Sequence, residues 1–129
     1  MSTEAVKRVA RSVKDRVSAE EWDTRVDLAA CYRLAAHYRM TDLIYTHISA
    51  RVPGPEHHFL INAFGLTWDE ISASALVKVT LDGEIVDDPT GSGINRAGYV
   101  IHSAVHRARP SERTTTRRAG SSRGPAARA

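Results

Sequence analysis

LVKVTLDGEIV, residues 76–86, is the stretch that decides the fold. Apolar and polar residues alternate on both sides of Asp82-Gly83, and Asp-Gly between alternating runs is the strongest short-range signal for a β-hairpin. Upstream, residues 48–52 alternate in the same way, residues 53–55 (PGP) force a turn, and residues 59–61 return as a second strand. The middle of the chain therefore predicts two antiparallel hairpins.

Helical patterns flank the hairpins. Ser18 and Glu21 form a capping box, and the apolar spacing behind it predicts a helix that ends near Met40. A second helix begins near Asn95 and ends at Pro110. Its apolar stripe consists of Ala97, Val100, Ile101, Ala104, Val105 and Ala108.

The chain of 129 residues predicts one domain, with a loosely ordered leader at 1–17, a body at 18–110 and a tail at 111–129. The tail has five arginines and one acid and lacks any large apolar residue, so we expect it to be disordered. The net charge of the tail is +4 and that of the whole chain is +3, so the rest of the chain has a net charge of −1. A nearly neutral body argues against nucleic-acid binding.

Composition also bears on the compartment. No apolar run approaches the roughly 18 residues of a membrane span. The first twenty residues contain no secretory h-region, and the single cysteine, Cys31, has no disulfide partner. These features predict a cytoplasmic protein without a membrane association.

Candidate site residues come from three places. His47 and Ser49 share the polar face of a strand, where they would contact a small ligand or simply face solvent. Asn62 and Gly65 lie at a turn that could present backbone N–H groups to an anion. The pair His102 and His106, one helical turn apart, would be a partial metal site or two hydrogen-bonded structural imidazoles; no general-base Glu lies between them.

Three segments in order resemble the N-terminal half of the class II aldolase/adducin family. They are RVDLAACYRLAAHYRMTDLIYTHISARVPG (25–54), HHFLINAFGLTWDEISASALVKVTLDGEIV (57–86) and INRAGYVIHSAVHRARP (94–110). The resemblance implies an α/β fold, an incomplete three-layer α/β/α sandwich around a mixed, mostly antiparallel sheet. Family enzymes are zinc-dependent aldolases or epimerases of sugar-phosphate metabolism and are usually oligomers.

The resemblance also implies which site residues are missing. The family's acid/base Glu falls on Gly98, and the Gly-Asn phosphate loop of the aldolases falls on Thr46-His47. An H-x-H zinc pair is expected shortly after the A-R-P element, but no histidine follows His106. We therefore expect no catalytic residue, no metal ligand and no cofactor in this chain, whereas a full-length family member would bind zinc.

Two functions follow from the resemblance. The first is a class II aldolase/adducin-like protein that is inactive in this form and has a small carbonyl compound or sugar phosphate as its candidate ligand. The alternative is an adducin-like protein-interaction or assembly module. The change of pattern at Pro110 suggests a truncated or frameshifted member. Open sheet edges and an apolar stripe that has lost part of its cover would then favour self-association.

Overall fold

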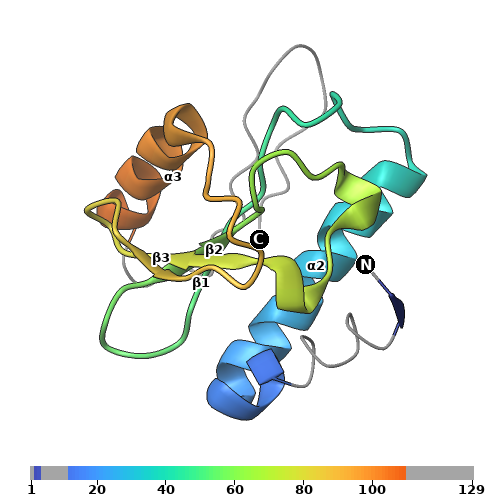
Figure 1. Ribbon diagram of the computed structural model, residues 1–129. Helices are drawn as coiled ribbons and strands as arrows, with labels where there is room; N and C mark the ends of the chain where they lie inside the picture. The colour runs from blue at the N-terminus through green and yellow to red at the C-terminus, as the bar shows by residue number, and fades with distance from the viewer. Residues whose placement is uncertain (1, 4–11, 110–129) are drawn as a thin grey trace.

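A computed structural model describes residues 2, 3 and 12–109, and the fold is given for these alone. The named elements, in chain order, are α2 (Ala19–His37), β1 (Ala50–Arg51), β2 (Phe59–Ile61), η1 (Trp68–Glu70), η2 (Ala73–Ala75), β3 (Val77–Val79), β4 (Ile85–Asp87) and α3 (Arg96–Ala108). Figure 1 shows α2 and α3 on opposite sides of the sheet. The expected three-layer α/β/α arrangement is confirmed.

The four strands form one sheet in the order β1-β2-β3-β4. Every pairing between them is antiparallel, with Ala50 opposite Leu60 and Ile61 opposite Val77. Both expected hairpins are therefore present, and the second turns at Asp82-Gly83, where Gly83 adopts a φ of 95°. The register of β3 and β4 shifts at Lys78/Val79.

Strand β2 shows how the sheet divides the core. Its side chains alternate, so Leu60 packs with Leu28 and Tyr32 of α2 on one face. Phe59 and Ile61 face the other way and pack with Tyr99 of α3. All three residues of β2 are fully buried because a helix covers each face of the sheet.

Helix α2 begins where the sequence predicted. The Glu21 N–H donates to Ser18 Oγ at 3.0 Å, but the Glu21 carboxylate does not return to Ser18. It pairs instead with Arg25 at 2.9 Å and with Lys78 at 2.8 Å. Arg25 is itself fully buried and donates to the Leu76 carbonyl at 2.9 Å. Half of the expected capping box is thus replaced by an ion network that fastens α2 to β3.

Helix α2 has apolar residues on two sides, but only one side is covered. Val26 and Leu34, on the second side, are 45% and 57% exposed. Only the stripe with Leu28 and Tyr32 faces the sheet.

The ends of the chain are described in part. Residues 12–16 are helical, and Val13 is fully buried. The rest of the loosely ordered leader, and the tail at 111–129, lie outside the described residues and remain predictions. None of the described helices is both long and apolar enough to cross a bilayer.

Candidate functional site

A buried group of polar side chains lies between α3 and the sheet. It consists of His47, Ser49, Asn62, His102 and His106, and we call it the histidine cluster. Each of these residues is at most 4% exposed. Buried polar side chains in such number are uncommon in a domain core and tend to mark functional sites or specific structural networks. The cluster is therefore the candidate site.

Two spacings bring the cluster together. Gly98, His102 and His106 follow one another at intervals of four residues, so they share one face of α3, and all three are buried. His47 and Ser49, two residues apart before β1, share one side of an extended segment. The polar face of α3 therefore packs against the polar side of this segment.

Ser49 is the centre of the cluster. Its hydroxyl oxygen lies 2.6 Å from His102 Nδ1 and 2.8 Å from His106 Nε2. His106 Nδ1 is buried and has no hydrogen-bond partner among the described residues. A proton on that nitrogen would be a buried unsatisfied donor, so the proton belongs on Nε2. His106 Nε2–H then donates to Ser49 Oγ, and the Ser49 hydroxyl donates to His102 Nδ1.

Both helix histidines are neutral at pH 7. Burial lowers the pKa of His102 to about 4, and the nearby His47 and His106 rings add to the effect. Burial also lowers the pKa of His106 to about 4, assisted by the Arg51 guanidinium. His106 stacks on Phe59, with ring centroids 4.8 Å apart. The core environment thus disfavours an imidazolium at either position.

His47 belongs to a second network. Its Nδ1 lies 2.8 Å from Asn62 Oδ1, which also accepts the Tyr32 hydroxyl at 2.9 Å. The Tyr32 hydroxyl oxygen in turn accepts the Ile48 N–H at 2.8 Å. Because Asn62 Oδ1 is an acceptor, the His47 proton lies on Nδ1. Tyr32 and Asn62 therefore fix the orientation of the His47 ring.

The His47 ring also excludes a side chain from residue 98. A Cβ built on Gly98 would lie 2.4 Å from His47 Cδ2 and 2.7 Å from His47 Nε2. Atoms of these kinds do not approach so closely, so only glycine fits at position 98 while His47 keeps its place. The residue before His47, Thr46, has a φ of 63°, a conformation that a β-branched residue rarely adopts. Backbone strain is thus located next to this ring.

The described residues do not fit a zinc ion. Hydrogen bonds join the His102 and His106 imidazoles to Ser49 and the His47 imidazole to Asn62. In the part of the chain that the structure describes, no three His, Cys, Asp or Glu side chains are grouped so that they could hold a metal.

The predicted site residues can now be placed. The structure brings His47, Ser49 and Asn62 together, but Gly65 lies apart in an exposed turn with a φ of 85°. The reading of His47 and Ser49 as a solvent face is wrong, because α3 covers both. The hydrogen-bonded imidazoles expected for His102 and His106 are present. The sequence did not lead us to expect that His102 and His106 would contact Ser49. The signal was present, because His102 and His106 have the four-residue spacing of one helix face and His47 and Ser49 the two-residue spacing of one strand face.

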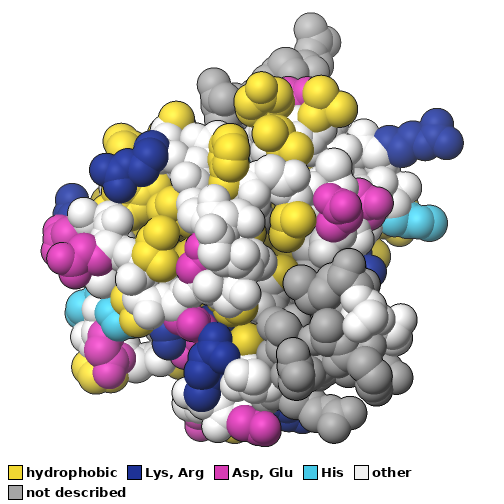
Figure 2. All heavy atoms as spheres, in the orientation of Figure 1, with side chains coloured by type: hydrophobic (Ala, Val, Ile, Leu, Met, Phe, Trp, Pro, Cys, Tyr) yellow, Lys and Arg dark blue, Asp and Glu magenta, His cyan; other side chains and the backbone are white. Residues whose placement is uncertain are grey.

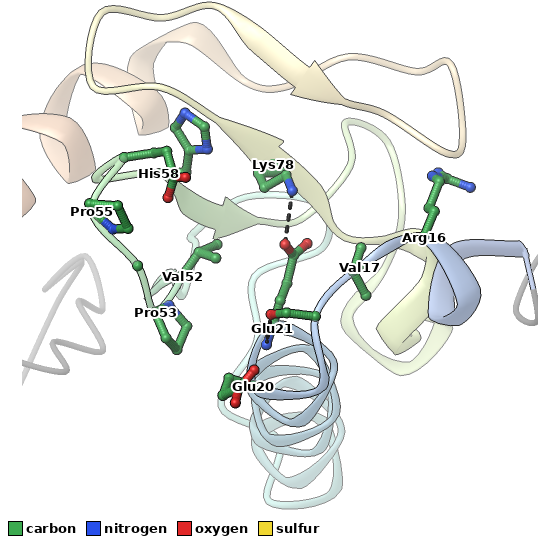
Figure 3. A pocket seen from close by; sticks show the side chains of 12 residues that line it. Arg16, Val17, Glu20, Glu21, Val52, Pro53, Pro55, His58 and Lys78 are labelled. Carbon is green, nitrogen blue, oxygen red and sulfur yellow. Dashed lines mark hydrogen bonds and ion pairs between the residues drawn. The ribbon is translucent and has the colours of Figure 1, made fainter.

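A separate pocket of about 630 Å³ lies beside the N-terminal end of α2 and contains none of the predicted site residues. Figure 3 shows Lys78 and Glu21 pointing toward one another within it. The second cation that lines it, Arg16, pairs with Asp87 at 2.8 Å. Both cations are engaged in ion pairs, so the pocket offers weaker electrostatic attraction to a ligand than its composition suggests.

Comparison with known proteins places this geometry in a family. A family model described as Class II Aldolase and Adducin N-terminal domain matches residues 26–114. A Caulobacter vibrioides protein with the name "Putative aldolase class 2 protein" is 60% identical over 98 residues, which are 76% of this chain and 38% of that protein. Alpha-adducin of Mus musculus is 53% identical over 87 residues, 67% of this chain and 12% of adducin.

A solved structure is also similar. The crystal structure of an aldolase II superfamily protein from Pseudomonas syringae superimposes with a TM-score of 0.77 at 72% identity, covering 79% of this chain and 41% of that one. The chain thus spans about two fifths of the length of the bacterial proteins it matches.

Proposed function

Because this chain belongs to the class II aldolase and adducin N-terminal domain family, we propose that it is a member without aldolase activity. The single observation that carries the proposal is the contact between His47 and position 98. In the family resemblance, position 98 is the place of the acid/base Glu, and here it is a glycine whose side-chain space is filled by an imidazole. A carboxylate cannot stand there without displacing His47.

The electrostatics of the cluster support the same proposal. An aldolase of this family works through a zinc-stabilised enediolate, and zinc would supply the charge that stabilises this intermediate. In the histidine cluster, His102 and His106 are instead neutral imidazoles that hydrogen-bond to Ser49, and His47 hydrogen-bonds to Asn62. Its residues hold the α3–sheet junction together and orient His47, and none of them is positioned with others to bind a metal.

The experiment is an aldol-cleavage assay on a panel of ketose 1-phosphates, run with added zinc and in parallel with EDTA. An active zinc-dependent aldolase of the family, assayed alongside, shows that the conditions support cleavage. We expect no product above the protein-free rate. Zinc-dependent cleavage that EDTA abolishes would refute the proposal.

The family resemblance also supports a protein that binds a small carbonyl compound or a sugar phosphate without converting it. Ligand binding stabilises the native state in proportion to the logarithm of ligand concentration over Kd. A rise in Tm with increasing ketose 1-phosphate would support a ligand-binding protein without turnover. An unchanged Tm up to millimolar concentration would remove this ligand class from consideration.

A second candidate function is protein assembly. It is favoured by the exposed apolar side of α3, where Val100 is 59% and Ile101 is 45% exposed. We propose self-association as the form that this assembly takes.

A further inference from the structure

The turn between β3 and β4 is built around Thr80. The Thr80 N–H donates to the Glu84 carbonyl at 2.9 Å, and the Thr80 carbonyl accepts the Gly83 N–H at 3.3 Å. The second distance is longer than the roughly 2.9–3.0 Å of an ordinary N–H···O bond, so the Gly83 amide is weakly held. Gly83 itself has a φ of 95°, which glycine adopts without a steric penalty. The main-chain nitrogen that follows Asp82 is therefore only loosely restrained.

Asp82 presents its carboxylate to solvent at this turn. Its side chain is 87% exposed, and Asp82 Oδ1 lies 3.1 Å from Arg107 Nη2 of α3. In Figure 2, acidic and basic side chains lie at the surface on the left edge, where Figure 1 places this turn beside α3. The Arg107 guanidinium also donates to the Leu81 carbonyl at 2.8 Å. One side chain of α3 thus holds both the Asp82 carboxylate and the main chain just before it.

We propose that Asp82 is a site of spontaneous isomerisation to isoaspartate in the folded protein. The Gly83 nitrogen forms a bond to Asp82 Cγ and loses its proton, the carboxyl group loses its hydroxyl, and one water leaves as a five-membered succinimide closes. One water then adds to a ring carbonyl. Opening at the former main-chain carbonyl carbon gives isoaspartate, and opening at Cγ restores aspartate. One water is released and one is consumed, so the mass of the chain is unchanged and no other reagent is needed.

Asp82 differs from the other aspartates in its neighbour and its place. It is the only aspartate in the sequence that is followed by glycine, and neither asparagine is followed by glycine. A side chain on the following residue hinders ring closure, and glycine has none. Asp23 and Asp27 are also exposed, but they lie within α2, where regular hydrogen bonds fix the next amide. Exposure alone therefore does not select the site.

The modification would disturb the attachment of this turn to α3. Isoaspartate lengthens the main chain by one methylene group at a place with little spare room, since a Cβ built on Gly83 would lie 3.1 Å from Tyr99 Cε1. The Tyr99 hydroxyl donates to the Leu81 carbonyl, and the Tyr99 ring stacks with Phe59 at 6.0 Å between centroids. A longer turn shifts these contacts, so the modified protein should be less stable.

Arg107 restrains the reaction. The Asp82 carboxyl group must turn toward the Gly83 nitrogen, and the contact with Arg107 opposes that rotation. An exposed ion pair is a weak interaction, so its loss in Arg107→Gln should accelerate isomerisation by no more than about fivefold. An unchanged or lower rate in Arg107→Gln would contradict this restraint.

Ageing the full chain at neutral pH and separating its peptides by liquid chromatography and mass spectrometry tests the proposal. Isoaspartyl and aspartyl peptides have the same mass but elute separately, and electron-transfer fragmentation locates the altered bond. Labelling by an isoaspartyl carboxyl methyltransferase quantifies the same product independently. We expect isoaspartate to accumulate at Asp82, with Asp23 and Asp27 unchanged as internal controls. Asp82→Glu is the matched variant, because it keeps the charge but cannot close a five-membered ring, so its label should stay at background.

Thermal melts connect the chemistry to the structure. Aged wild type should have a lower Tm than fresh protein, whereas aged Asp82→Glu should keep its fresh value. An unchanged Tm in protein that carries isoaspartate would overturn the expected loss of α3 contacts.

Two outcomes would overturn the site itself. One is an Asp82 that stays intact in the folded chain while the same chain in urea accumulates isoaspartate, since the turn would then protect the bond. The other is isoaspartate that forms at Asp23 or Asp27 as fast as at Asp82. Neither outcome depends on aldol cleavage or on assembly, so the site stands or falls separately from the proposed functions.

Discussion

The imidazole of His47 occupies the space that a side chain on Gly98 would need, with His47 Cδ2 only 2.4 Å from the position of a Cβ. The side chain that position 98 can hold therefore depends on the size of residue 47, although the two positions are 51 residues apart in sequence. The ring is held from the other side by Asn62, at 2.8 Å from His47 Nδ1. His47 cannot retreat without breaking that hydrogen bond, so the contact resists relaxation.

This coupling predicts a reversal of sign in a double-mutant cycle. Gly98→Ala should destabilise the protein by about 1–3 kcal/mol, because an extra methyl group in a packed core forces neighbours to move. In a His47→Ala background the space is open, and the same substitution should be neutral or should stabilise by up to about 1 kcal/mol through helix propensity. Urea unfolding of the four proteins measures both steps. Equal effects of Gly98→Ala in the two backgrounds would show that no contact exists.

Ser49 is expected to stabilise the fold more than another buried serine does. Ser49→Ala leaves His106 Nε2–H and His102 Nδ1 without their shared partner, at a cost of about 1–3 kcal/mol. Ser103→Ala is the control, since Ser103 is also buried but donates only to the Val100 carbonyl of its own helix. Its loss should be below about 1 kcal/mol. Urea unfolding at pH 7 compares them, and a larger effect at Ser103 would contradict the proposed centre of the cluster.

Stability should fall as the solution is acidified. His102 and His106 have pKa values of about 4 in the folded protein, against about 6.5 when unfolded. Between these values the unfolded chain binds protons that the folded chain does not, so acid favours unfolding. The stability from these groups is complete above pH 6.5, declines toward pH 4 and changes no further below it.

Thermal melts from pH 7.5 to 4 measure this slope. His106→Asn should flatten it, whereas the same change at the exposed His57 should leave it intact. A Tm that does not depend on pH in this window would contradict the burial of neutral imidazoles.

Thr46 offers a prediction about backbone strain. Thr46→Gly should stabilise the protein by up to about 1 kcal/mol, because glycine adopts a φ of 63° without the penalty of a β-branched residue. Thr41 is exposed and is not among the residues with positive φ, so Thr41→Gly should destabilise. Chemical unfolding of both variants distinguishes them. Destabilisation by Thr46→Gly would mean that the Thr46 side chain contributes more than its backbone costs.

Local signals in the sequence were sufficient for the elements. Ser18 predicted the start of α2, and Asp82-Gly83 predicted the second hairpin, because caps and tight turns depend on residues close in sequence. The burial of His47 and Ser49 could not be predicted in the same way. Their alternation indicates a polar face but not what covers it, and the covering helix lies some fifty residues later.

The side of α3 that faces the sheet could not be predicted from local sequence patterns either. Its amphipathic pattern defines two sides, and apolar residues alone would assign the side with Val100, Ile101 and Ala104 to the core, although all three are exposed. The polar side is buried instead because Ser49 satisfies both His102 Nδ1 and His106 Nε2. The family resemblance identified Gly98 as a changed site position, but the contact with His47 required coordinates.

The most direct test of the central claim is metal analysis of the full chain after equilibration with zinc and removal of free metal. The account predicts well below one zinc per chain, and equal values for wild type, His102→Ala and His106→Ala. These imidazoles hydrogen-bond to Ser49, and no third metal ligand is grouped with them among the described residues. The two variants should lose stability and leave the metal content unchanged. One tightly held zinc per chain that disappears in either variant would contradict the account.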